Sequence, residues 1–86
     1  MAIKLKNASF KYNHDWFSEQ DPYINLLLDG IHVFSSSIKW EAGKEADWDG
    51  EGIEFNYKEF KGFNSLTLVA YDKEKYKNDD LIGKSN

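Results

Sequence analysis

Residues 22–34 read PYINLLLDGIHVF, and they decide the fold because they describe one complete β-hairpin. An Asp-Gly pair between two apolar runs is the strongest short-range signal for a tight two-residue hairpin turn, and Asp29 and Gly30 form such a pair here. Pro22 stands at the mouth of the first run, where its missing backbone donor does little harm to a strand. The two antiparallel strands that we expect lie over 23–28 and 31–39.

Segments on both sides of this hairpin alternate apolar and polar residues, as strands with one buried face do. Ile3 and Leu5 alternate with lysines, and the run from Leu66 to Tyr71 alternates in the same way. Glycines among charged residues over 41–52 indicate a loop. The further strands that we expect lie over 3–10, 53–57, 66–71 and from Leu81 onward. Short strands separated by turns, without a helix of ordinary length, predict an all-β antiparallel sandwich or barrel.

Length and composition limit the classes of protein that are possible. With 86 residues, 41% of them hydrophobic, the chain is long enough for a single domain over 1–86 with one modest core. The absence of Cys removes disulfides and thiol nucleophiles, and it suits a cytoplasmic protein. A net charge of −4 without a basic stripe argues against a nucleic-acid partner. No apolar run approaches the roughly 20 residues that span a bilayer, so we expect any membrane contact to be peripheral.

Three of the expected connections carry acids. If successive strands run up and down, the connections over 11–21, 40–52 and 72–80 emerge at the same end of the fold. The carboxylates that this arrangement brings to one end are Asp15, Asp21, Asp72, Glu74, Asp79 and Asp80. Like charges so close repel one another, and a hard cation that takes roughly six to eight oxygen ligands would neutralise them. The residues alone leave a cation site and a solvated acidic face as alternatives.

Calcium suits these acids better than zinc does. Zinc prefers His or Cys ligands, and His14 and His32 fall at opposite ends of the strand expected over 23–28. Magnesium remains an alternative hard cation.

Pieces along the chain match one known pattern. They are residues 3–8, 21–26, 37–39, 42–44, Trp48, Phe55, 69–74 and 79–83. These pieces resemble the C2 domain family, the calcium- and phospholipid-binding module of signalling and membrane-trafficking proteins. The strongest piece is VAYDKE followed by DDLIG, which looks like the family's third loop and the strand after it. The resemblance implies a C2-like β-sandwich that apparently lacks the last two strands, which a protein partner or an additional chain segment would supply.

The same resemblance implies roles for the acids. Asp21 opens an Asp-Pro-Tyr motif six residues after Asp15, as the second first-loop calcium ligand of the family does. Glu74 stands where the family more often has Asp, and Lys77 stands where some members have an oxygen ligand, so we expect only one or two ions. Asp79 is expected to be a neighbour and not a ligand. The calcium ligands that the resemblance implies are Asp15, Asp21, Asp72, Glu74 and Asp80.

Large rings and lysines are expected beside these carboxylates. An aromatic ring exposed on a polar loop leaves its apolar surface in water unless a partner covers it. Aromatic side chains favour the headgroup region of a membrane. The residues that we expect to contact an anionic phospholipid membrane are Trp16, Phe17, Tyr76, Lys73, Lys75 and Lys77. The alternative for the first two rings is that each packs into the core. Trp48, by contrast, matches the family's buried tryptophan.

The sequence therefore predicts a module, not an enzyme, that binds anionic phospholipid membranes through calcium, loop carboxylates and loop aromatics. The main alternative keeps the fold without the metal, as a calcium-independent protein-docking or scaffold module. A second alternative is a carbohydrate-binding sandwich, whose rings would form a planar platform. An enzyme is disfavoured because the sequence has no evident Ser-His-Asp arrangement, no Cys and no Gly-rich phosphate loop.

Overall fold

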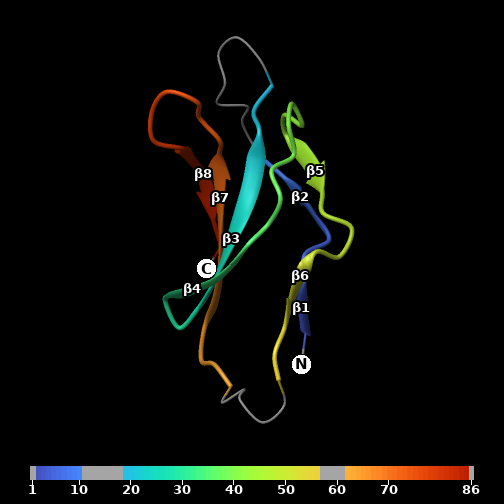
Figure 1. Ribbon diagram of the computed structural model, residues 1–86, viewed down its shortest axis with the longest axis vertical. Coiled ribbons are helices and arrows are strands. Elements are labelled where there is room, and N and C mark those ends of the chain that lie inside the picture. Colours follow the sequence, from blue (N-terminus) through green and yellow to red (C-terminus); the bar gives the residue numbers. More distant parts are fainter. Residues whose placement is uncertain (1, 11–18, 57–61, 86) are drawn as a thin grey trace.

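The computed structural model describes residues 2–10, 19–56 and 62–85, and every regular element in this part of the chain is a β-strand. The strands are β1 (Ala2–Lys4), β2 (Asn7–Ser9), β3 (Pro22–Leu28), β4 (Ile31–Ser35), β5 (Glu45–Asp47), β6 (Gly52–Glu54), β7 (Leu66–Asp72) and β8 (Asp80–Lys84). All of their pairings are antiparallel, which confirms the expected all-β class (Figure 1). None of the residues described forms a helix with the length and apolarity that crossing a membrane requires.

The larger sheet has the strand order β4-β3-β7-β8. At its centre, β3 and β7 pair along their whole seven-residue length, beginning with Pro22 opposite Asp72. Asp29 and Gly30 connect β3 to β4 with φ angles of 52° and 80°. Two positive φ angles are typical of a type I′ hairpin turn, whose twist matches that of the flanking strands. The hairpin predicted from residues 22–34 is confirmed.

Two short ladders form the second layer of the sandwich. β1 pairs with β6 and β2 pairs with β5, and Figure 1 shows both ladders beside the larger sheet. Between β1 and β2, the Leu5 N–H donates to the Glu51 carbonyl oxygen at 2.6 Å, which keeps this segment attached. β6 begins at Gly52, where an added Cβ atom would lie 1.9 Å from the Ile3 carbonyl oxygen. Glycine at this position therefore allows the two backbones to approach closely.

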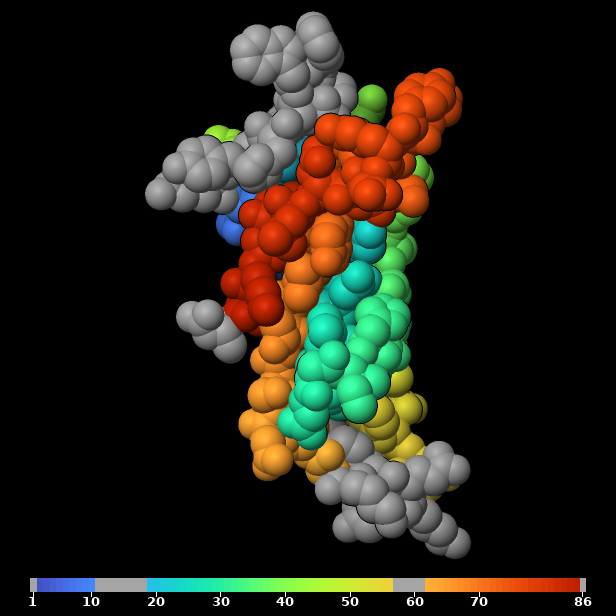
Figure 2. Space-filling model, turned by 90° about the vertical axis from the view of Figure 1, so that its left-hand side faces the viewer, coloured from blue at the N-terminus to red at the C-terminus, as the bar shows by residue number. Residues whose placement is uncertain are grey.

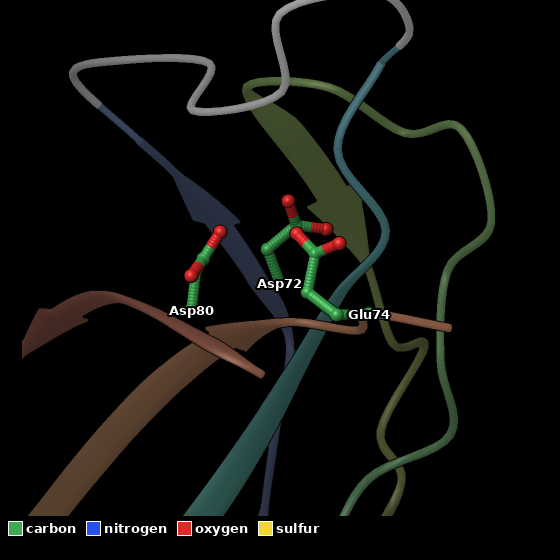
Figure 3. Close-up of side chains that lie close together, drawn as sticks. All are labelled: Asp72, Glu74 and Asp80. Atoms are coloured by element: carbon green, nitrogen blue, oxygen red, sulfur yellow. The ribbon is translucent and has the colours of Figure 1, made fainter. Parts of the chain in front are cut away.

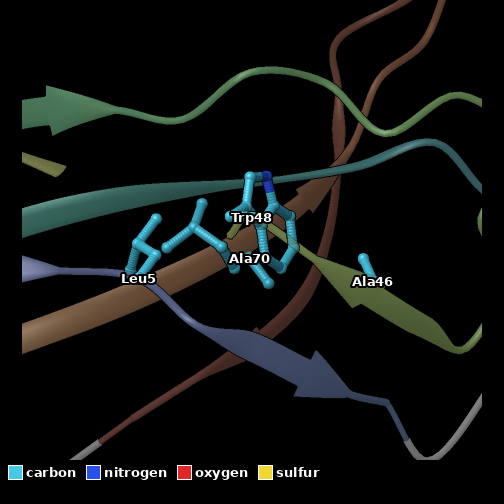
Figure 4. Packing of buried hydrophobic residues seen from close by; sticks show 5 residues of the cluster. Leu5, Ala46, Trp48 and Ala70 are labelled. Atoms are coloured by element: carbon cyan, nitrogen blue, oxygen red, sulfur yellow. The ribbon is translucent and has the colours of Figure 1, made fainter. Parts of the chain in front are cut away.

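The core lies between the two layers and is centred on Trp48, which is 1% exposed. The other members of its buried cluster come from both layers and are Leu5, Ile24, Ala46 and Ala70 (Figure 4). The indole Nε1–H of Trp48 donates a hydrogen bond of 2.9 Å to the Ser37 carbonyl oxygen, so its one polar atom is satisfied. Burying such a ring contributes about 5 kcal/mol before entropy is subtracted. Trp48 is thus the buried tryptophan that the sequence led us to expect.

The second layer differs from the sequence-based expectation in two places. The single strand expected over 3–10 is divided into β1 and β2, and the loop expected over 41–52 contains β5. A pattern search misses β5 because Ala46, its one core-facing residue, is small and lies between two acids. Its strand conformation comes from pairing with β2, which is distant in the sequence.

The strand expected over 31–39 is also shorter, because β4 ends at Ser35. At the next position, the Ser36 hydroxyl accepts the Ile24 N–H at 2.8 Å, while the Ser36 N–H donates to the Ile24 carbonyl oxygen at 2.8 Å. A side-chain oxygen thus replaces a backbone carbonyl in the ladder, and regular pairing stops there. The strand expected over 53–57 corresponds to β6.

Candidate functional site

One end of the sandwich gathers residues 19–21, 40–44 and 72–80, and we call this end the rim (Figure 1). β7 ends at Asp72, β8 begins at Asp80, and the strand register pairs these two residues directly. Glu74 follows β7 by two residues, and Figure 3 shows the three carboxyl groups directed into the same space. One oxygen from each of these three carboxylates lies within 4.8 Å of the other two. We call Asp72, Glu74 and Asp80 the acid cluster.

Asp72 is the buried member of the acid cluster, with 0% of its surface exposed, whereas Glu74 and Asp80 are half-buried. Its Oδ1 atom accepts a hydrogen bond of 2.7 Å from the Asp21 N–H. A carboxylate taken out of water is stable only where donors or positive charge compensate for the lost hydration. The residue immediately before β3 therefore supplies part of the compensation for a buried charge at the end of β7.

Asp21 joins three segments of the rim, but its carboxylate is not part of the acid cluster. Its backbone binds Asp72, as above, and its carbonyl oxygen accepts the Lys73 N–H at 3.0 Å. Its side-chain Oδ1 accepts the Glu41 N–H at 2.5 Å. The structure thus places Asp21 next to the cluster, with one carboxylate oxygen directed to the segment that follows β4.

Negative charge accumulates at the acid cluster, where the pKa values of its member Glu74 and of the neighbouring Lys77 are both shifted. Desolvation, a hydrogen bond with Asp80 and repulsion by Asp72 and Asp80 raise the pKa of Glu74, and the charge of Lys77 only partly opposes them. The Lys77 Nζ atom lies 3.3 Å from Asp80 Oδ2. A hydrogen bond and charge attraction from Asp80, followed by attraction to Glu74, raise the pKa of Lys77. Both shifts are those expected where carboxylates outnumber cations.

Asp79, on the segment between β7 and β8, belongs to a different network of hydrogen bonds and charges from the acid cluster. Its carboxylate accepts hydrogen bonds from the Tyr23 hydroxyl at 2.5 Å and from the Glu74 N–H at 2.8 Å, and Lys73 Nζ lies 3.7 Å away. Desolvation opposes ionisation of Asp79, but these donors and the lysine charge together hold its pKa below the usual value. Desolvation and the bond to Asp79 raise the pKa of Tyr23 to about 12. Asp79 thus fastens the segment between β7 and β8 to the sheet.

The segment between β7 and β8 carries the expected membrane-contacting residues that the structure describes. Tyr76 is 89% exposed, and Figure 2 shows this segment projecting from the upper end of the molecule. The Lys75 Nζ atom lies 5.4 Å from the centroid of the Tyr76 ring, a cation–π distance. Lys73 and Lys77 face Asp79 and Asp80, as described above. The other three residues with expected roles, Asp15, Trp16 and Phe17, lie outside the described residues.

Trp40, for which the sequence motifs indicated no role, lies at the rim with 66% of its surface exposed. Trp40 lines an open cavity of about 580 Å³, together with the residue that precedes β3 and residues of the segment that follows β7. Those other lining residues are Asp21, Lys73, Glu74 and Lys75. The sequence did contain a signal for Trp40, because the connection that begins at residue 40 was expected at the same end as the acids.

An antiparallel β-sandwich with acids and exposed rings on the loops at one end defines a binding module of the kind that contacts a surface. A model of the C2 domain family matches residues 1–86, and the chain therefore belongs to the C2 domain family. This match confirms the resemblance that the sequence motifs carried. C2 domains are typically non-catalytic modules that bind membranes, lipids or proteins, and they often bind Ca²⁺. The comparison with curated proteins found no match.

Proposed function

We propose that this chain binds anionic phospholipid membranes in a calcium-dependent manner through its rim. The observation that carries the proposal is the acid cluster, in which three carboxylates each offer an oxygen within 4.8 Å of the others. Carboxylate oxygens are the ligands that Ca²⁺ prefers in proteins, and a divalent ion would neutralise the negative charge that Asp72 and Asp80 place beside Glu74. The donor set fits calcium because the cluster contains no nitrogen or sulfur ligand.

Each member of the acid cluster would contribute differently to the calcium site. Asp72, held by the Asp21 N–H, would be the fixed ligand, and Asp80 would be positioned by its pairing in β8. Glu74 stands on the connecting segment and has one methylene more than an Asp, so it would adapt to the ion. Asp15 and Asp21 are the proposed further ligands. When bound, the ion would supply the positive charge that attracts an anionic headgroup.

Rings and lysines of the rim would make the remaining membrane contacts. Tyr76, exposed at the tip of its segment, would enter the headgroup region, and Trp16 and Phe17 are proposed to do the same. Lys73, Lys75 and Lys77 would each add about 1 kcal/mol next to anionic lipid. Because Lys77 now faces Asp80, an ion in the acid cluster would free its ammonium group for a phosphate.

Calorimetric calcium titration and vesicle co-sedimentation test this proposal together. We expect the chain to bind calcium and to sediment with anionic vesicles in calcium but not in chelator. The double variant Asp72→Asn, Asp80→Asn should lose calcium affinity by about 100-fold or more, because even indirect supporting contacts of a metal site contribute about 10- to 100-fold. Asp49→Asn is the matched control, since it removes the same kind of charge from an exposed turn between β5 and β6. A flat calcium titration would contradict the proposal.

The second candidate function is calcium-independent protein docking, and one observation favours it. Lys77 already provides a positive charge 3.3 Å from Asp80, so the acid cluster is partly neutralised without a metal ion. If this is the function, calcium produces no heat, and vesicles do not bind the chain in either calcium or chelator. The same two measurements therefore separate the two functions.

A further inference from the structure

The carboxylate of Asp79 connects the larger sheet to the segment that follows β7. Its Oδ2 atom accepts the hydroxyl of Tyr23, a residue of β3, at 2.5 Å. Its Oδ1 atom accepts the Glu74 N–H at 2.8 Å. One side chain that is not itself a member of the acid cluster therefore joins a strand of the sheet to the backbone of a member of that cluster.

The sheet end of this connection is firmly held. Tyr23 lies opposite Tyr71 in the register of β3 with β7, and the centroids of the two rings are 5.7 Å apart with 23° between their planes. A backbone ladder and a stacked neighbouring ring both restrict where the Tyr23 hydroxyl can lie. The hydroxyl therefore offers Asp79 a donor at a defined position.

Glu74 is the member of the acid cluster that lies outside the strands. Asp72 ends β7 and Asp80 begins β8, and the strand register pairs them, whereas Glu74 stands two residues beyond β7. The hydrogen bond from the Glu74 N–H to Asp79 takes the place of a ladder bond at this position. A ligand that is held in place before an ion arrives lowers the ordering cost of binding.

The contacts of Asp79 favour a supporting role over a role as a ligand. Each of its two oxygens accepts a hydrogen bond, and Lys73 Nζ lies 3.7 Å from Oδ2. A cation would have to displace these donors and approach the lysine charge in order to bind Asp79 directly. Contacts that orient the ligands of a metal site commonly change its affinity by about 10- to 100-fold without touching the ion.

We infer that Tyr23 is a positioning residue for the acid cluster. Acting through Asp79, its hydroxyl fixes the backbone of Glu74 beside the other two carboxylates. The inference rests on the proposed function for its consequence, which is that Tyr23 strengthens calcium binding although it is not one of the proposed ligands.

Amide hydrogen exchange without calcium tests the positioning directly. Tyr23→Phe keeps the stacked ring and removes the hydroxyl, so the Glu74 amide should exchange about fivefold faster than in the parent. The ladder amides of β3 and β7 should exchange at the parental rate. Tyr71→Phe is the matched control, because it removes the same atom from the neighbouring ring and should leave Glu74 unchanged. Faster exchange throughout β3 and β7 would overturn the inference, since the hydroxyl would then stabilise the sheet as a whole.

Calcium titration followed by amide chemical shifts, which also measures weak binding, tests the consequence. Tyr23→Phe should weaken calcium binding about tenfold, and Tyr71→Phe should not weaken it. If Tyr23 acts through Glu74, adding Tyr23→Phe to Glu74→Ala should weaken binding by no more than about twofold further. A tenfold loss in both backgrounds would overturn the inference, because Tyr23 would then act on the site by another route.

The two measurements separate this inference from the proposed function. A flat calcium titration of the parent, with faster exchange at Glu74 in Tyr23→Phe, would overturn calcium binding and leave the positioning of Glu74 by Tyr23 standing. Calcium binding by the parent, with equal exchange at Glu74 in the two proteins, would overturn the positioning and leave the calcium proposal standing.

Discussion

The two ends of the larger sheet use aspartate in opposite ways. We call the end formed by residues 29–31 and 62–65 the hairpin end. There, Asp29 Oδ1 accepts the Asn64 and Ser65 N–H groups at 2.8 and 2.9 Å. One carboxylate thus accepts hydrogen bonds from two backbone donors, and these bonds hold the loop before β7 in place. At the rim, three carboxylates crowd together, and desolvation, a hydrogen bond with Asp80 and repulsion by Asp72 and Asp80 raise the pKa of Glu74.

An aspartate next to a strand end is therefore structural or available for a ligand according to the ratio of donors to carboxylates around it. Asp79 shows that the distinction is local, because it lies on the same segment as Glu74 and yet faces Tyr23, Lys73 and a backbone N–H. Exposed apolar side chains do not distinguish the ends, since Ile31 is 68% exposed at the hairpin end and Trp40 is 66% exposed at the rim.

The largest effect on stability is expected from Asp29→Ala. Losing a charged acceptor for two backbone donors should lower the free energy of unfolding by about 2 kcal/mol. Asp29→Asn keeps one acceptor oxygen and tolerates the positive φ, so it should lose less. Denaturant unfolding checks both variants, and calcium titration should give the same affinity for both as for the parent. A change in calcium affinity would break the contrast between the two ends.

The hydrogen bond between Tyr23 and Asp79, the structural carboxylate of the rim, leads us to expect a pH effect on stability. Tyr23 has its pKa raised to about 12 beside Asp79, so the folded state keeps a proton that the unfolded chain loses near its ordinary value of 10.0. Stability should therefore fall as the pH rises from about 10 to about 12, by up to about 2 kcal/mol. Tyr23→Phe should lose this dependence, as unfolding measured across that range would show. Identical pH curves for the two proteins would contradict the assignment of the shift to Tyr23.

Exposed rings at the rim should matter to membrane binding and exposed aliphatic groups at the hairpin end should not. Tyr76→Ala is expected to weaken binding to anionic vesicles in calcium about tenfold, through the apolar area that no longer enters the headgroup region. Ile31→Ala removes a comparably exposed apolar group from the opposite end and should bind as the parent does. Co-sedimentation over a lipid titration measures both. Equal losses would mean that the rim is not the membrane-facing end.

The smallest effect is expected from Lys77→Gln. Removing the ammonium group that faces Asp80 leaves the acid cluster more negative, so calcium affinity should rise about threefold. Lys75→Gln is the matched control, because Lys75 faces the Tyr76 ring instead of a carboxylate. Calorimetry at low and high salt would show the gain and its screening. A fall in calcium affinity would indicate that Lys77 supports the site instead of competing with the ion.

The sequence was informative where the signal is local. The Asp29-Gly30 turn and the alternation in β3 and β7 were predicted with nearly correct boundaries, because turn chemistry and a two-residue period depend on neighbouring residues alone. β5 was missed because its conformation depends on a distant partner strand. Trp40 was missed as a candidate because an exposed ring and a core ring look the same in a sequence, and only packing separates Trp40 from Trp48.

By itself, the sequence determined that this protein is an antiparallel β-sandwich with its acids on connecting loops, since strand period, turn residues and family motifs are all written along the chain. The tertiary structure alone decided which carboxylates lie close together and which are bound by other groups. Asp72 lies opposite Asp80 through the register of β7 with β8. The carboxylate of Asp21, in contrast, accepts the Glu41 N–H, and that of Asp79 accepts the Tyr23 hydroxyl. Electrostatic interaction depends on distance in space, and segments far apart in the chain set those distances.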